Sequence, residues 1–161
     1  MLFRSSVTIE SESNTFFSKL DSESSGSFGA KTSKTETVRT RDTVQSNIVG
    51  NGVTIESGED TRIKGSTVQS AGDLSLKADG GIQILNDWDV AERHVEKSET
   101  GMGHVSGQSH NQGSASATVV GSALVADGAV AVEAGESVVM QGSAIAGDSV
   151  DVTAEIGRAH V

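Results

Sequence analysis

Short segments that alternate apolar and polar residues recur along this chain, spaced about 20 residues apart in the clearest cases. The full copies are residues 52–57, 72–78, 128–134 and 147–154, and a shorter copy is residues 6–11. Alternation with a period of two is typical of a β-strand with one buried face. Other short strands are expected between the copies, and Gly-Asp, Gly-Glu and Gly-Ser steps separate them as turns. A unit this short that holds two or three strands predicts one coil of a β-solenoid.

Stacking such coils would place alternate side chains in aliphatic ladders inside the solenoid. The residues predicted to point inward are Val53, Ile55, Leu74, Leu76, Ile82, Ile84, Val130, Val132, Val150 and Val152. Their outward neighbours Thr54, Ser75 and Asp151 are predicted to face water. Aromatic residues make up only 3% of the chain, so its core has to be narrow and built from aliphatic side chains.

A longer period is superimposed on the short one. Residues 46–69 align with residues 122–146 at a shift of about 76 to 77, with one small insertion. The Gly65-Ser66 and Gly142-Ser143 steps fall in register. Two polar stretches, about 12–45 and 87–121, interrupt the repeats. They could be disordered loops, but alternation in the threonine-rich residues 34–40 favours extended hairpins leaning out of the solenoid.

Both ends of the chain break the repeat pattern. Residues 155–161 resemble the translation of a sequencing adapter, and residues 1–5 resemble its reverse complement. The natural sequence is therefore expected to be residues 6–154. The start of the chain does not resemble a signal peptide, and no apolar run approaches the ~20 residues needed to cross a bilayer.

At residues 52–60 and 64–78 the chain resembles the hemagglutinin repeats of filamentous hemagglutinin-like exoproteins. The first stretch contains Val-Thr-Ile and Ser-Gly-Glu-Asp, and the second combines Lys-Gly-Ser with Ala-Gly-Asp. A weaker second copy covers residues 130–154. The resemblance implies a right-handed parallel β-helix that is secreted to the cell surface of a Gram-negative bacterium through an outer-membrane two-partner secretion transporter. It also implies display on a long filament that acts as an adhesin, or as a contact-dependent growth inhibition toxin-delivery protein, toward a receptor on a host or neighbouring cell.

Charge and composition exclude several other classes of protein. The formal net charge of −10 argues against binding to nucleic acid or to an anionic membrane, both of which need clustered Lys and Arg. The chain has no cysteine, which excludes disulfides and thiolate metal sites.

The residues with the most chemical potential form no recognised site. His94, His104 and His110 lie in one polar stretch with acidic neighbours, but their spacing matches no metal-ligand motif; these neighbours are Asp87, Asp89, Glu92 and Glu96. We expect these histidine and acidic side chains to be solvated in a loop. Residues 101–107 contain spaced glycines without the strand and helix of a dinucleotide fingerprint. We therefore expect no catalytic residue, no metal ligand and no cofactor.

Four further residues have structural interpretations. Asp60, Asp73 and Asp148 are read as Asx-type turn residues rather than as the acidic cluster of a β-helical polysaccharide lyase. Trp88 either covers the end of a coil or is an exposed contact residue.

Three functions remain open: a structural stalk, a receptor- or glycan-binding module that acts through the polar stretches, and a carbohydrate-active enzyme. Unpaired strand edges at both ends predict a chain that is marginally stable or aggregates when isolated.

Overall fold

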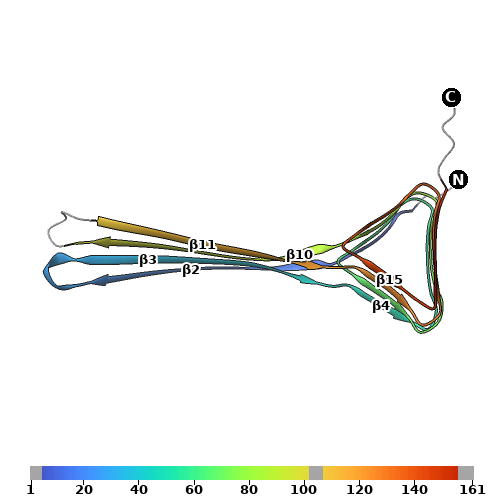
Figure 1. The fold of residues 1–161 in the computed structure, drawn as a ribbon, viewed down its shortest axis with the longest axis horizontal. Coiled ribbons are helices and arrows are strands. Elements are labelled where there is room, and N and C mark those ends of the chain that lie inside the picture. The colour runs from blue at the N-terminus through green and yellow to red at the C-terminus, as the bar shows by residue number, and fades with distance from the viewer. Residues whose placement is uncertain (1–4, 102–106, 156–161) are drawn as a thin grey trace, which may run out of the picture. The chain divides into compact units, whose positions relative to one another are not determined.

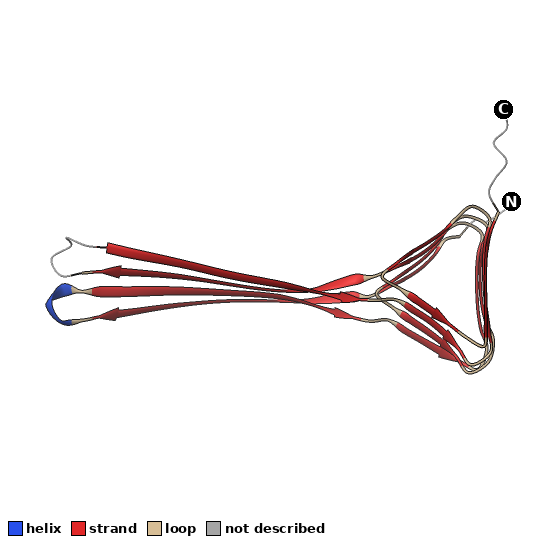
Figure 2. Ribbon diagram, in the orientation of Figure 1, coloured by secondary structure: helices blue, strands red, loops and turns tan. Residues whose placement is uncertain are grey.

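The computed structural model describes residues 5–101 and 107–155, and it confirms an all-β protein. Strands make up most of the described chain, with a short 3₁₀ turn at Ser27–Gly29 (Figure 2). The segments interpreted as adapter-derived lie outside the described residues except for Ser5 and Glu155. The described residues divide into two compact units, named here the repeat unit (residues 5–12, 43–88 and 119–155) and the hairpin unit (residues 13–42, 89–101 and 107–118).

The repeat unit contains three parallel sheets of four strands each within the described chain. Sheet I consists of β1 (Val7–Glu10), β6 (Thr61–Lys64), β9 (Ile82–Leu85) and β14 (Val138–Gln141). Sheet II consists of β4 (Asn47–Gly50), β7 (Thr67–Ser70), β12 (Ala123–Ala126) and β15 (Ala144–Ala146). Sheet III consists of β5 (Val53–Ser57), β8 (Leu74–Ala78), β13 (Ala129–Ala134) and β16 (Ser149–Ala154).

The chain visits these sheets in a fixed order, II then III then I, and each circuit is called a pass. Successive passes are β4-β5-β6, β7-β8-β9, β12-β13-β14 and β15-β16, with β1 preceding them (Figure 1). Each strand pairs in parallel with its equivalent in the next pass. In sheet III, for example, Leu74 lies opposite both Val53 and Val130. Segments about 20 residues apart in the sequence therefore lie side by side, as the short period predicts.

One aliphatic core lies between the three sheets. Ile63, Val68, Leu74, Leu76, Ile82, Ile84, Leu124, Val130 and Val132 are all at most 1% exposed. Most of the predicted inward ladder is thus confirmed, and Ile55 is partly buried against the same core. The prediction was wrong for Val150 and Val152, which are 46% and 43% exposed. They occupy the same register as Val130 and Val132, but β16 is the edge strand of sheet III among the described residues.

The longer period corresponds to a block of strands. The aligned strands β6 and β14 both lie in sheet I, and β7 and β15 both lie in sheet II. Gly65 and Gly142 make the turn between these sheets with φ of +52° and +56°, a conformation that glycine adopts readily. At the two other steps from sheet I to sheet II, β1 to β4 and β9 to β12, a long hairpin replaces the Gly-Ser turn.

The hairpin unit is a separate antiparallel sheet. Its strands are β2 (Glu12–Ser25), β3 (Lys31–Val44), β10 (Asp87–Thr100) and β11 (Gly107–Val120), in the order β11-β10-β3-β2. The two hairpins join through β3 and β10, which pair over eleven residues from Val90 opposite Arg41 to Thr100 opposite Lys31. Where the structure describes them, the polar stretches are therefore mostly extended strands, as the threonine-rich alternation favoured. Most side chains of this sheet are exposed.

Candidate functional site

The acidic residue Asp87 lies in the repeat unit, at the step from sheet I to sheet II. Its side chain is 3% exposed. It accepts hydrogen bonds from Ser11 Oγ at 2.9 Å and from the Trp88 backbone N–H at 2.9 Å, and Lys64 Nζ lies 3.2 Å away. Burial opposes ionisation of Asp87, but the hydrogen bonds from Ser11 and Trp88 and the charge of Lys64 outweigh it. The net effect lowers the pKa of Asp87 below its usual value, so the side chain is a buried carboxylate.

Polar side chains from neighbouring passes meet at this same corner. Ser66 and Ser122 are buried, and Ser122 Oγ donates to the Leu85 carbonyl at 2.6 Å while accepting from the Ser66 N–H at 3.2 Å. With the amide of Asn86 oriented to satisfy its neighbours, its oxygen accepts from Trp88 Nε1 at 3.0 Å. These contacts satisfy backbone groups where the chain turns, so the corner holds successive passes together.

Trp88 combines features of both interpretations drawn from the sequence. Its indole hydrogen-bonds at the corner, yet 44% of the residue is exposed. Its backbone carbonyl accepts from Thr43 Oγ1 at 3.3 Å. Trp88 therefore fastens the end of one polar stretch to the start of the next while leaving part of its ring in solvent.

Asp60 and Asp73 lie at turns, as predicted, but their hydrogen bonds differ from those of an Asx turn. Asp60 Oδ1 accepts from the Gly81 N–H at 2.8 Å, and Asp73 Oδ1 accepts from the Ala129 N–H at 2.9 Å. In both cases the donor belongs to the following pass: Gly81 precedes β9, and Ala129 is the first residue of β13. These carboxylates therefore link neighbouring passes. Asp148 occupies the equivalent turn before β16.

The histidines and their acidic neighbours do not converge in the described part of the chain. His94 Nε2 lies 3.2 Å from Glu96 Oε1 on the exposed strand β10, and His110 is exposed on β11. His104 lies outside the described residues, as does most of the 101–107 glycine segment. Asp87 is separated from the others by its burial at the corner. Among the residues that the structure describes, no group of three or more His, Cys, Asp or Glu could hold a metal ion.

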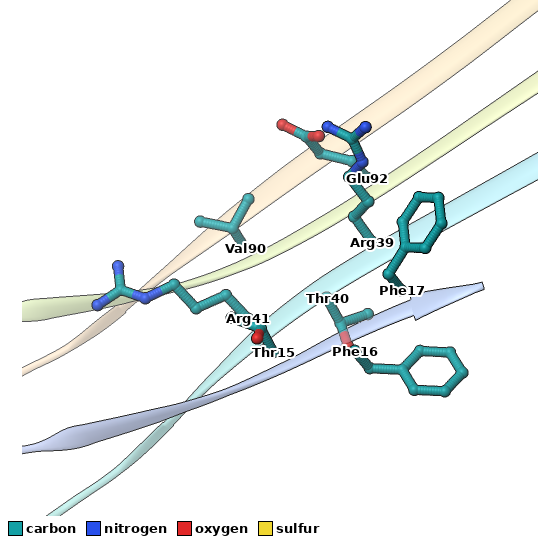
Figure 3. Close-up of a pocket in the computed structure, with 8 residues that line it drawn as sticks. All are labelled: Thr15, Phe16, Phe17, Arg39, Thr40, Arg41, Val90 and Glu92. Atoms are coloured by element: carbon teal, nitrogen blue, oxygen red, sulfur yellow. The ribbon is translucent and has the colours of Figure 1, made fainter. Parts of the chain in front are cut away.

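The hairpin unit carries an exposed apolar surface that sequence reasoning did not single out. Phe16, Phe17 and Leu20 on β2 are 59%, 58% and 64% exposed. Successive side chains of a strand point to opposite faces, and Figure 3 shows the rings of Phe16 and Phe17 directed to different sides of β2. The available signal was that this is the only adjacent aromatic pair in the sequence.

A shallow hollow of about 440 Å³ lies on this sheet, lined by Thr15, Phe16, Phe17, Arg39, Thr40, Arg41, Val90 and Glu92 (Figure 3). The guanidinium carbon of Arg39 lies 5.4 Å from the centre of the Phe17 ring, within the range of a cation–π interaction. Glu92 is the register partner of Arg39 on β10, and Val90 is the partner of Arg41. The hollow thus combines an aromatic face, two guanidinium groups and one carboxylate.

A charged cluster stabilises the same sheet farther along. Glu36 accepts from Arg93 Nε at 2.7 Å and from Lys34 Nζ at 3.0 Å. Hydrogen bonds from Arg93 and then Lys34 lower the pKa of Glu36 to about 2. Thr35 Oγ1 donates to Asp21 Oδ1 at 2.7 Å, which ties β3 to β2 and, with Lys19, lowers the pKa of Asp21. These cross-strand contacts stabilise a sheet that has little apolar core of its own.

The groups on the hairpin surface are of the kinds that bind ligands. An exposed aromatic ring beside guanidinium and carboxylate groups offers stacking and hydrogen bonding to a polar ligand or to a protein surface. No helix in the described residues is long and apolar enough to span a membrane.

Comparison with known proteins gives one informative match. A family model described as the hemagglutinin repeat matches residues 25–159. Neither curated proteins nor solved structures give a significant match. The matched range covers most of the passes, β3, and the β10–β11 hairpin. It includes most of the residues that show the short and long periods in the sequence. The chain therefore belongs to the hemagglutinin repeat family.

Proposed function

We propose that the repeat unit is a segment of right-handed parallel β-helix that serves as a non-catalytic stalk in a large filamentous surface protein. The observation that carries this proposal is the in-register parallel pairing of successive passes around one aliphatic core. In such an arrangement each pass contacts only its neighbours, so a chain can be lengthened pass by pass without enlarging the core. This geometry suits a filament that projects a distant functional part away from the cell.

Membership of the hemagglutinin repeat family supports the biological setting. We propose that the parent protein is secreted through an outer-membrane two-partner secretion transporter and displayed on the outer surface of a Gram-negative bacterium. There it acts as an adhesin or as the delivery filament of a contact-dependent growth inhibition toxin. Both roles require a receptor on a host or neighbouring cell.

The carboxylates of the repeat unit support a non-catalytic role. Asp60 and Asp73 accept hydrogen bonds from backbone N–H groups of the following pass, and Asp87 is buried and paired with Lys64. Each of these carboxylates therefore helps to hold neighbouring passes together. The expected result is that the purified chain leaves acidic polysaccharides intact; cleavage by the chain would overturn this part of the proposal.

A second candidate function is direct binding of a receptor or glycan by the hairpin unit. The observation that favours it is the exposure of Phe16, Phe17 and Leu20 on β2, with Arg39 packed over the Phe17 ring, on a sheet where most other side chains are polar. Large apolar side chains exposed on an otherwise polar surface can mark an interaction site.

One experiment separates the two functions. In the full-length parent protein, Phe16→Ser combined with Phe17→Ser removes the aromatic surface, and Val49→Ser serves as a control because Val49 is also exposed, at 67%, but lies in the repeat unit. A stalk predicts unchanged surface display and unchanged cell attachment for both variants. Loss of attachment by the aromatic double variant alone, with display intact, would favour the binding function.

A further inference from the structure

All four described steps from sheet I to sheet II are closed by the same contact, whether the step is a short turn or a hairpin. In each, a serine Oγ donates to the carbonyl of the residue that ends the sheet I strand. The pairs are Ser46 with Glu10, Ser66 with Lys64, Ser122 with Leu85 and Ser143 with Gln141, at 2.6–2.8 Å. Only Gly65 separates Lys64 from Ser66, and only Gly142 separates Gln141 from Ser143. Each hairpin therefore occupies a position where the next pass has a single glycine.

Two hydrogen bonds join the bases of the two hairpins, and they are named here the base contacts. Ser11, which precedes β2, donates from Oγ to Asp87 Oδ2, at the start of β10, over 2.9 Å. Gln45, which follows β3, donates from Nε2 to the carbonyl of Gly121, which follows β11, over 3.1 Å. Both contacts join residues that are 76 apart, which matches the long period of the sequence. All four residues belong to the repeat unit.

Gly65 lies between the two residues of the first base contact. The strand β6, which ends just before Gly65, pairs with β1 on one side and with β9 on the other. A Cβ added at Gly65 would lie 2.6 Å from Ser11 Oγ and 2.9 Å from Asp87 Cβ. The contact between Ser11 and Asp87 therefore crosses the intervening pass through space that is open because residue 65 has no side chain.

The register in which β3 pairs with β10 is not the one that the side chains of these two strands favour. Lys34 lies directly opposite Lys97, and like charges at opposed positions destabilise an antiparallel pair. The observed register has one opposed pair of unlike charges, Arg39 with Glu92.

A shift of β10 by two residues would keep every side chain on its present face and would improve the opposed pairs. It would place Lys34 opposite Glu99, Glu36 opposite Lys97, Val38 opposite Val95 and Arg41 opposite Glu92, all of which are favourable pairs. The shift would give up the pair of Arg39 with Glu92 and the diagonal contact of Arg93 with Glu36. The observed register therefore needs a cause outside the paired side chains.

We propose that the base contacts fix the register of β3 and β10. The chain runs directly from Asp87 into β10 and from β3 into Gln45, so holding these residues at a fixed offset sets the partner of every later residue. The register is already present beside the base contacts. Thr43 Oγ1 donates to the Trp88 carbonyl at 3.3 Å, and extending the observed pairing by two residues places Trp88 opposite Thr43. The repeat unit thus imposes on the hairpins a pairing that their own side chains do not specify.

Introduced cysteines report the register, because the chain has no cysteine of its own. Thr37 and His94 are register partners, so the full chain with Thr37→Cys and His94→Cys is expected to form a disulfide on mild oxidation. In the observed register Thr37 and Glu96 are diagonal neighbours ~7–8 Å apart, which disfavours a disulfide between cysteines at these positions. The favourable shift would bring them opposite each other. Thr37→Cys with Glu92→Cys reports a shift in the other direction.

Two variants break the base contacts in different ways. Ser11→Ala with Gln45→Ala removes both donors, and Gly65→Ala inserts a methyl group between Ser11 and Asp87 while keeping both side chains. Two hydrogen bonds favour one register by roughly thirtyfold, so the double variant is expected to lower the ratio of Thr37–His94 to Thr37–Glu96 disulfide by about that factor. Gly65→Ala is expected to lower the same ratio. The disulfide between positions 37 and 92 should stay rare in both variants.

Arg93→Gln is the matched control, because it removes the contact with Glu36 within the hairpin sheet and leaves both base contacts in place. It is expected to leave the disulfide ratio unchanged. An unchanged ratio in the variant with Ser11→Ala and Gln45→Ala would overturn the inference. An equal fall of the ratio in Arg93→Gln would overturn it as well, since the register would then depend on the paired side chains.

A separate cysteine pair checks that the passes stay intact when the base contacts are broken. Thr54 and Ser75 are register partners in neighbouring passes, so Thr54→Cys with Ser75→Cys is expected to form a disulfide in the unmodified chain. The same disulfide is expected in the background with Ser11→Ala and Gln45→Ala. Its loss only in that background would overturn the inference, because the base contacts would then hold the passes rather than the hairpin register. Its absence from both backgrounds would refute the parallel passes themselves.

Discussion

The same substitution at two equivalent positions should have different costs because only one position is covered. Val132 and Val152 occupy the same register in neighbouring strands, and they are 0% and 43% exposed. Val→Ala removes two carbons, worth ~0.8 kcal/mol each when fully buried, so Val132→Ala loses ~1.6 kcal/mol of transfer free energy. The cavity left between two packed layers raises the expected cost to about 2 kcal/mol or more.

At Val152 the expected cost of the substitution to Ala is below about 1 kcal/mol, because nearly half of the side chain is already in water and the open edge leaves no enclosed cavity. Urea unfolding, followed by circular dichroism, measures both values. Equal costs at the two positions would refute the assignment of β16 as an uncovered edge. A larger cost at Val152 would refute the packing account altogether.

Three further predictions concern the corner and the hairpin unit. Gly65→Ala is expected to lower the free energy of unfolding by about 1–2 kcal/mol, because Gly65 has a φ of +52° and an added Cβ would lie 2.6 Å from a serine oxygen. Urea midpoints measure this loss. Gly52→Ala is the control and should show no comparable loss, because a Cβ added there would meet no atom within 4 Å. Asp87→Asn removes a buried charge that Lys64 and two hydrogen bonds stabilise, and is expected to cost about 2 kcal/mol by the same assay; an unchanged midpoint would contradict the role of this carboxylate. The folded pKa of Glu36, about 2, lies below its ordinary 4.5, so its contribution to stability is present above pH 4.5 and is lost as the pH falls toward 2. Thermal melts at a series of pH values should show that Glu36→Gln flattens the dependence of stability on pH. Parallel curves of stability against pH for the two proteins would refute this prediction.

The repeat unit was largely predictable because its sequence alternates in step with burial. Leu74 and Leu76, flanked by polar residues, had one possible inward face, and their copies about 56 residues later share it. The fate of Val150 and Val152 could not be read in the same way, since alternation identifies the inward face but not whether another strand covers it.

The hairpin unit and the corner were harder to predict. Strands that are polar on both faces do not specify their register, so nothing in the sequence indicated that β3 pairs with β10. The burial of Asp87 depends on Ser11, which is 76 residues away in sequence, and the residue by itself resembles an ordinary solvated aspartate. The exposed surface formed by Phe16 and Phe17 was not predicted, because the residues next to this pair in the sequence are polar.

The parallel stacking of passes is tested most directly by methyl–methyl contacts in solution. With isotope-labelled Ile, Leu and Val methyl groups, nuclear Overhauser spectra are expected to connect Leu76 with both Ile55 and Val132, its register partners in the preceding and following passes. Contacts at sequence separations of about 20 and 56 residues would establish the passes. Consecutive strands should then lack the contacts that pair them as antiparallel hairpins. A set of contacts restricted to neighbouring hairpin strands would contradict the account.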